Sequence, residues 1–185
     1  MAAALAAVVV VRSTLLPSGA HFAFHCLVIV GLLLGARRLG LDATDLGLAR
    51  STWRTGARDG AIAFALVATV VGVGAFLADV DDSRIDVSLG SMLLRVLVVI
   101  PIGTVLMEEL AFRGVLLAAA RRATSTWRAV LVSSLAFGAW HVVTAWNSST
   151  GDTPLRIGAV VGTVVVTGAA GAAFCWLRLW RHSLL

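Results

Sequence analysis

Residues 96–120 read VLVVIPIGTVLMEELAFRGVLLAAA, and this stretch decides how the chain folds. It is long enough to cross a membrane, because about 20 apolar residues in a helix span about 30 Å of hydrocarbon. Its middle nevertheless holds Glu108, Glu109 and Arg113. A charge at the centre of a lipid-embedded helix costs roughly 2.5–3.5 kcal/mol on insertion scales, so such residues normally face protein or water. The stretch therefore predicts a membrane helix that carries a polar site inside a helical bundle.

The composition agrees with a membrane protein. Of the 185 residues 59% are hydrophobic and 14% charged, with a mean hydropathy of +0.94, whereas soluble domains are about half apolar and about a quarter charged. All 15 basic residues are arginines, and most of them lie at the ends of apolar runs or in the connectors between them. The net charge of +5 therefore reflects membrane topology and argues against a nucleic-acid-binding surface. Cys26 and Cys175 lie within apolar runs, where we expect small buried hydrophobes and no disulfide.

The remaining apolar runs complete an all-α fold. With a short or truncated first segment at the N-terminus, we expect a single multi-pass transmembrane helical bundle of about five to six spans. The predicted complete spans are residues 20–36, 60–78, 93–120, 127–143 and 155–177.

The connectors between these spans alternate in charge. Residues 37–59 hold five arginines against three aspartates, residues 79–90 hold four aspartates and one arginine, and residues 121–128 hold three arginines and no acid. The positive-inside rule therefore assigns the first and third of these connectors, with Arg178 and Arg181, to the cytoplasm.

One polar segment is too hydrophilic to cross the membrane. Residues 42–59 carry Leu46, Leu48 and Trp53 among charged residues, which predicts an interfacial segment on the cytoplasmic membrane surface. The expected organisation is N-terminal membrane helices with this segment over residues 1–89, followed by a membrane core over residues 90–185 that carries the polar site.

The two adjacent glutamates, the only two in the chain, are the first candidate site. Glu109 and Arg113 are four residues apart, a favourable ion-pair spacing on one helix face. Glu108 points about 100° away from Glu109 and is left free for chemistry. The alternative interpretation is an ion-pair cluster that only packs the bundle, or side chains that reach interfacial water.

His141 is the second candidate, within FGAWH at residues 137–141. Phe137 lies one helical turn before it, and Gly138 is expected to open space beside it. A carboxylate and an imidazole together can activate water for attack on an amide. Alternatively, His141 is a hydrogen-bonded core residue.

Other polar residues give weaker signals. His21 and His25 are four apart on one helix face, a spacing that can hold a metal, but no third ligand is nearby in the sequence. For Ser133 and Ser134 we expect hydroxyls that bond back to their own helix. The chain contains no HExxH, so a zincin-type protease is not supported.

The two motifs resemble a known family. EELAFR (Glu108, Glu109, Arg113) matches the EExxxR motif of the CAAX-processing and bacteriocin-processing (CPBP, or Abi) intramembrane proteases, and FGAWH (Phe137, His141) matches their FxxxH motif. The similarity covers roughly residues 90–185. It implies a type II CAAX prenyl endopeptidase-like hydrolase in which Glu108 is the general base, His141 its partner, and Glu109 with Arg113 a supporting ion pair.

The resemblance also carries expectations about substrate and cofactor. It implies an integral protein of a bacterial cell membrane that cleaves a membrane-associated peptide, of CaaX or bacteriocin type. The family is often classed as metalloproteases, although a metal-free mechanism is also argued for it. A divalent metal such as zinc, if bound, is expected on Glu108, Glu109 and His141.

The similarity departs from the family's pattern near the C-terminus. The family usually has a third motif, His-x-x-x-Asn or His-x-x-x-Asp, in a later helix that supplies oxyanion-hole groups. Residues 181–184 resemble the turn before that helix, so His182 is not the motif histidine and the last helix is expected to be missing from this chain. The alternatives are therefore a catalytically degenerate family member that acts as a membrane immunity or scaffold protein, or a transporter that uses both glutamates as a proton relay.

Overall fold

The structure, a computed structural model, describes residues 8, 11, 16–77 and 88–184. These residues form helices and connecting turns without any strand, so the predicted all-α bundle is confirmed. Most of the N-terminal segment and of the acidic connector at 79–90 lies outside the described residues.

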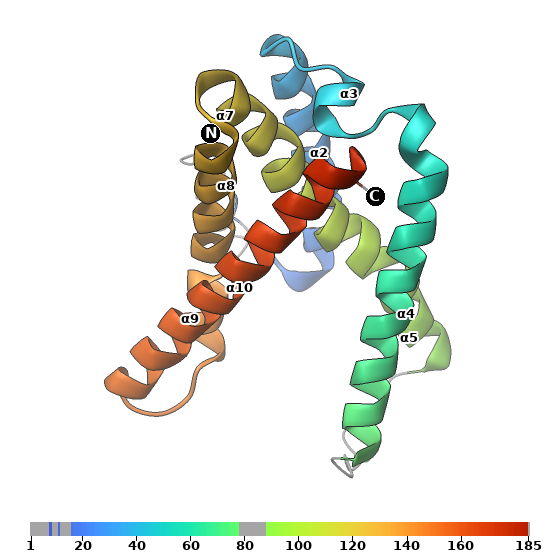
Figure 1. Ribbon diagram of the computed structural model, residues 1–185. Coiled ribbons are helices and arrows are strands. Elements are labelled where there is room, and N and C mark those ends of the chain that lie inside the picture. The colour runs from blue at the N-terminus through green and yellow to red at the C-terminus, as the bar shows by residue number, and fades with distance from the viewer. Residues whose placement is uncertain (1–7, 9–10, 12–15, 78–87, 185) are drawn as a thin grey trace.

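The elements follow one another along the chain with short connections (Figure 1). The α-helices are α2 (His21–Arg38), α3 (Ala43–Leu46), α4 (Trp53–Leu77), α5 (Leu89–Leu94), α6 (Met107–Glu109), α7 (Leu117–Ala123), α8 (Thr126–Trp140), α9 (Val142–Ser148) and α10 (Thr153–Arg181). Two π-helical segments, η4 (Arg95–Leu106) and η5 (Leu110–Leu116), join α5, α6 and α7 into one continuous helix, and two 3-10 turns are η1 (Ser18–Ala20) and η2 (Arg50–Thr52).

Four helices in the described part of the chain are long and apolar enough to cross a membrane. They are His21–Arg38, Gly90–Ala123, Thr126–Ser148 and Thr153–Arg181. Side chains on their outer faces are exposed, for example Val165 at 63% and Val166 at 68%, as lipid contact requires. The count is lower than the predicted five to six. α4 covers most of the predicted span at 60–78 and stands to one side of the bundle (Figure 1), but it is not one of these four.

The continuous helix Gly90–Ala123 carries the glutamates and is the central helix of the bundle. Every residue of η5 is buried, and Met107 and Phe112 join Phe137 and Trp140 of α8 in one apolar cluster. Two π-helical segments flank the glutamates. In the first of them Pro101 lacks an N–H and its ring clashes with the carbonyl four residues earlier, so a regular α-helix is disfavoured there. π-helical turns occur frequently at functional sites.

Close packing of α8 on α10 depends on a glycine of the FGAWH sequence. A Cβ built at Gly138 lies only 2.7 Å from the backbone oxygen of Val164. The space that Gly138 was expected to open beside His141 is therefore filled by α10, and that expectation is wrong. Small residues that let helix backbones approach are typical of membrane helix pairs.

Gly138→Ala is expected to destabilise the protein, because a backbone atom cannot move aside as a side chain can. We expect a loss of about 1–3 kcal/mol, the cost of overpacking. The matched control is Gly158→Ala in α10, where nothing lies within 4 Å of the added Cβ. That change should stabilise α10 by about 0.5–1 kcal/mol. Unfolding in detergent measures both variants, and equal shifts in the same direction would contradict the packing argument.

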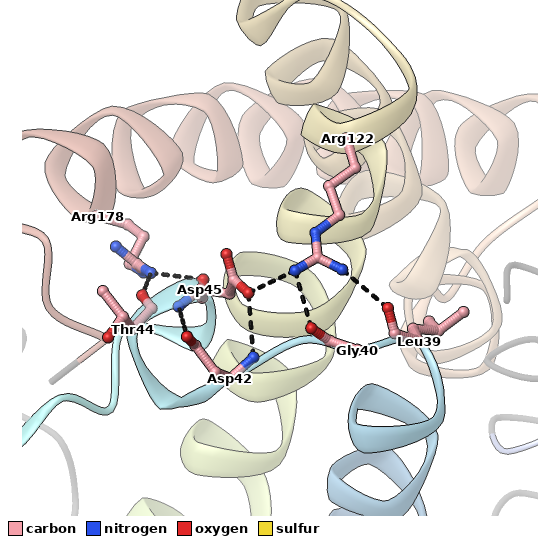
Figure 2. A network of polar contacts seen from close by, with 7 residues as sticks. All are labelled: Leu39, Gly40, Asp42, Thr44, Asp45, Arg122 and Arg178. Carbon is pink, nitrogen blue, oxygen red and sulfur yellow. Dashed lines mark hydrogen bonds and ion pairs between the residues drawn. The ribbon is translucent and has the colours of Figure 1, made fainter.

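The arginine-rich connectors meet at one end of the bundle. Arg122 of α7 donates hydrogen bonds to the backbone oxygens of Leu39 (2.8 Å) and Gly40 (2.9 Å) and pairs with Asp45 at 2.8 Å (Figure 2). Arg178 of α10 donates to the backbone oxygen of Asp45 at 2.9 Å. The polar connectors assigned to the cytoplasm thus share one end, as their charges predicted, while the side of the membrane stays a prediction.

The predicted interfacial segment is divided into several elements. Asp42 caps α3 in a capping box with Asp45, and Gly47 ends that helix in the left-handed conformation at φ 74°. Leu46 is buried against Leu110 and Val115 of the central helix, so its side chain faces protein and not the membrane surface. α4 begins already at Trp53, which is 49% exposed.

Candidate functional site

Both glutamates line a cavity of about 620 Å³. Its walls come from α4, the central helix, α8, α10 and the residues after α10, and this volume lies within the range of about 300–1,000 Å³ that ligand pockets have. The lining residues are Asp59, Gly60, Ile62, Val105, Glu108, Glu109, Phe137, Phe174, Leu177, Arg178, Trp180, Arg181, Ser183 and Leu184. The walls are mostly apolar, and the charged groups comprise three carboxylates and two guanidinium groups.

The ion pair that the i, i+4 spacing predicted is present. Arg113 Nη1 lies 3.1 Å from Glu109 Oε1, and the side chain of Arg113 is fully buried while that of Glu109 is 24% exposed. The guanidinium carbon stacks 3.9 Å from the centroid of the Phe137 ring and 5.1 Å from that of Phe174. Arg113 is therefore a buried cation held by one carboxylate and two aromatic faces.

Glu108 has a different environment from Glu109. Its Oε1 accepts a hydrogen bond of 2.9 Å from the indole Nε1–H of Trp140, which joins the central helix to α8. No other hydrogen bond or ion pair to Glu108 is found among the described residues. The geometry agrees with one carboxylate held by Arg113 and a second that keeps an oxygen for another partner.

His141 stands at the junction between α8 and α9. Its Nδ1 lies 2.9 Å from the backbone oxygen of Phe137, and its ring packs edge-on against the Phe137 ring with centroids 4.8 Å apart. Because a carbonyl oxygen only accepts, Nδ1 must carry the hydrogen. In the neutral ring Nε2 then has a free lone pair and can act as a base.

The structure brings the two motifs together through Phe137 and Trp140. Phe137 contacts both Arg113 and His141, and Trp140 binds Glu108. His141 itself does not line the cavity that contains the glutamates, and no hydrogen bond joins it to either glutamate in the described part of the chain. Phe137 and Trp140 are thus the connecting residues. Trp140 was missed in the sequence, although a buried indole N–H that needs an acceptor was the available signal.

The donor set does not form a metal site. Within the described ranges, no three His, Cys, Asp or Glu side chains lie close enough together to hold a metal ion. Glu109 is engaged by Arg113 and Glu108 by Trp140. The three side chains expected to hold a metal, Glu108, Glu109 and His141, therefore do not fit one as they stand.

Arg178 and Arg181 line the cavity, although in the sequence they indicate only the membrane topology. Arg181 Nε lies 2.9 Å from Asp59 Oδ2, which links the end of α10 to α4 across the cavity. Arg178 is buried and contacts Gly47 closely, since a Cβ added there lies 2.3 Å from its Nε. In the sequence, the only signal that Arg178 and Arg181 lie on the same surface was their spacing of three residues at the end of the last predicted span.

The remaining polar candidates are structural. Ser134 donates to the backbone oxygen of Val130 at 2.7 Å, the expected bond to its own helix. For Ser133 that expectation is wrong, because its hydroxyl donates to the backbone oxygen of Phe112 on the central helix at 2.9 Å. Cys175 is a buried free thiol, as predicted, whereas Cys26 is a free thiol that is only partly buried.

Comparison with known proteins adds one finding. A family model described as "Type II CAAX prenyl endopeptidase Rce1-like" matches residues 89–185. No curated protein and no solved structure matches the chain. The matched range contains both sequence motifs and agrees with the 90–185 expected from the resemblance.

Proposed function

The chain belongs to the type II CAAX prenyl endopeptidase Rce1-like family, whose model matches more than half of its length, and on this premise we propose that it hydrolyses a peptide bond of a membrane-associated substrate. The family is one of proteases, and the apolar helices make the chain an integral membrane protein. The observation that carries the proposal is the cavity in which Glu108 is held by Trp140 and not by a cation.

In the proposed reaction Glu108 acts as the general base. It removes a proton from a water molecule, and the hydroxide attacks the carbonyl carbon of the scissile bond. The proton then passes to the amine nitrogen as the carbon–nitrogen bond breaks, so Glu108 ends as a carboxylate again. Arg113 compensates the charge of the neighbouring Glu109 and so favours a single free base at the site.

His141 is proposed as the partner of Glu108 in handling that proton. The backbone oxygen of Phe137 fixes the ring so that Nε2 is the available base. Since the indole of Trp140 binds Glu108 and the next residue is His141, a small movement of α8 would change the distance between carboxylate and imidazole. A divalent metal on Glu108, Glu109 and His141 would require these side chains to rearrange, and elemental analysis of purified wild-type and Glu108→Gln protein tests whether one binds.

The substrate is proposed to enter from the lipid side with an apolar group. Phe174, Leu177 and Trp180 give the cavity an apolar wall on α10, while Arg178 and Arg181 place positive charge in the same wall. Such a surface suits a short peptide that carries a hydrophobic anchor and a negative group. A CaaX-like peptide, with a prenyl group and a C-terminal carboxylate, would meet this description, and a bacteriocin-type peptide is the other candidate substrate.

The test is hydrolysis of a lipidated peptide with a fluorophore and a quencher, by the purified protein in detergent. We expect His141→Gln to lower kcat about tenfold or more, because general acid–base partners contribute about 10²–10⁴ and Glu108 remains. The matched control is His182→Gln, an exposed histidine whose side chain does not line the cavity. Equal rates for the two variants would remove His141 from the mechanism. No hydrolysis by the wild-type protein would favour the immunity or scaffold alternative.

A further inference from the structure

A second cavity, of about 670 Å³, lies between the start of α2 and the start of the central helix. α2 and the Gly90–Ala123 helix run in the same direction, because Arg122 near the end of one binds the backbone just after the other. The second cavity is therefore at the end of the bundle opposite to the arginine network of Figure 2. It shares no lining residue with the cavity that contains the glutamates.

The lining of this cavity has a basic part and an apolar part. His21, His25 and Arg95 line it together with the hydroxyl residues Ser91 and Thr104, and no acidic residue is among its lining. Within the described part of the chain, Arg95 takes part in no ion pair. Phe22, Leu94, Val99 and Ile100 supply the apolar side.

The position along the helix decides which ligand suits this lining. The Gly90–Ala123 helix has 34 residues, whereas about 20 suffice to cross the hydrocarbon. Because Arg95 is close to the start of this long helix, we expect it at the level of the lipid head groups and not in the hydrocarbon. Lining residues continue from Ser91 to Thr104, about 15–20 Å along the helix axis, so the cavity passes from the head-group level into the acyl-chain level.

We propose that this cavity binds one phospholipid with a negatively charged head group. The phosphate lies against Arg95 and His21, and an acyl chain lies along Val99 and Ile100. A metal does not fit, because His21 and His25 have no third ligand in the described part of the chain. The proposal does not depend on the proposed function, and it gives His21 a role that peptidase chemistry leaves open.

The test uses purified full-length protein in detergent and native mass spectrometry. Phosphatidylglycerol, phosphatidylcholine and inorganic phosphate are each titrated. We expect phosphatidylglycerol to bind most tightly, and Arg95→Gln to weaken its binding about tenfold, since the substitution removes a charged hydrogen-bond donor to the phosphate. The matched control is Arg128→Gln, which removes one exposed arginine at the opposite end of the bundle.

Three results would overturn the proposal. Equal affinity for phosphatidylglycerol and phosphatidylcholine would show that the head-group charge is not recognised. Displacement of the lipid by millimolar inorganic phosphate would make this a site for free phosphate. Equal lipid affinity of Arg95→Gln and Arg128→Gln would place the lipid elsewhere. If Arg95→Gln does not fold, His21→Gln decides, and unchanged phosphatidylglycerol affinity in that variant rejects the site.

Discussion

Glu108→Gln is expected to lower kcat for peptide hydrolysis by about 10²–10⁴, the usual contribution of a positioned general base. Glutamine has the same shape, and its amide oxygen still accepts the hydrogen bond that Trp140 donates to Glu108 at 2.9 Å. Only the capacity to take a proton is lost. The free energy of unfolding should therefore stay within about 0.5 kcal/mol of the wild-type value, and KM should change little.

The comparison variant is Glu109→Gln, which changes the neighbouring residue in the same way. Glu109 is the ion-pair partner of the buried Arg113, so its substitution should lower stability as well as activity. Hydrolysis rates and unfolding in the same detergent separate the two effects. Full activity of Glu108→Gln, with or without an effect of Glu109→Gln, would rule out Glu108 as the base.

The sequence predicts the bundle and the position of its polar site because burial in lipid leaves few alternatives. Two glutamates inside an apolar stretch must face protein or water, and the central helix that carries them indeed contacts α2, α8 and α10. The i, i+4 spacing of Glu109 and Arg113 is enough to predict their ion pair, because a helix fixes the relative direction of both side chains.

The contacts between helices are not predictable in the same way, because they depend on how the helices pack. The sequence shows that position 138 has no side chain, but it does not show that the backbone of Val164 fills the space beside it. The hydroxyl of Ser133, like that of Ser134, could donate to a backbone oxygen of its own helix. It donates to the central helix instead, because the backbone oxygen of Phe112 lies within hydrogen-bond distance. Likewise, the indole that binds Glu108 belongs to the residue beside the motif histidine, and no periodicity reveals this.

Arg113→Met is expected to cost about 3 kcal/mol of unfolding free energy, at the lower end of the range for breaking a buried ion pair. The substitution has two opposing effects on the free energy of unfolding. The substitution removes a fully buried guanidinium whose Nε and Nη2 find no hydrogen-bond partner in the described part of the chain, which by itself would stabilise the fold. It also leaves Glu109 without its cation and removes the contact with the Phe137 ring. The cost of leaving the Glu109 carboxylate unpaired is the larger of the two effects, because only about a quarter of its side chain reaches solvent.

A double-mutant cycle separates these effects. Glu109→Gln with Arg113→Met leaves no unpaired charge, so the double variant should be more stable than Arg113→Met alone. Arg128→Met is the matched control, since Arg128 also stacks on an aromatic ring, that of Trp127, but is exposed. Its substitution should change the free energy of unfolding by less than about 0.5 kcal/mol. If Arg113→Met and Arg128→Met are equally stable, Arg113 is not the cation that stabilises the Glu109 carboxylate inside the bundle. The distinction between a Glu109 that is paired and a Glu108 that is available as a base then has no physical basis.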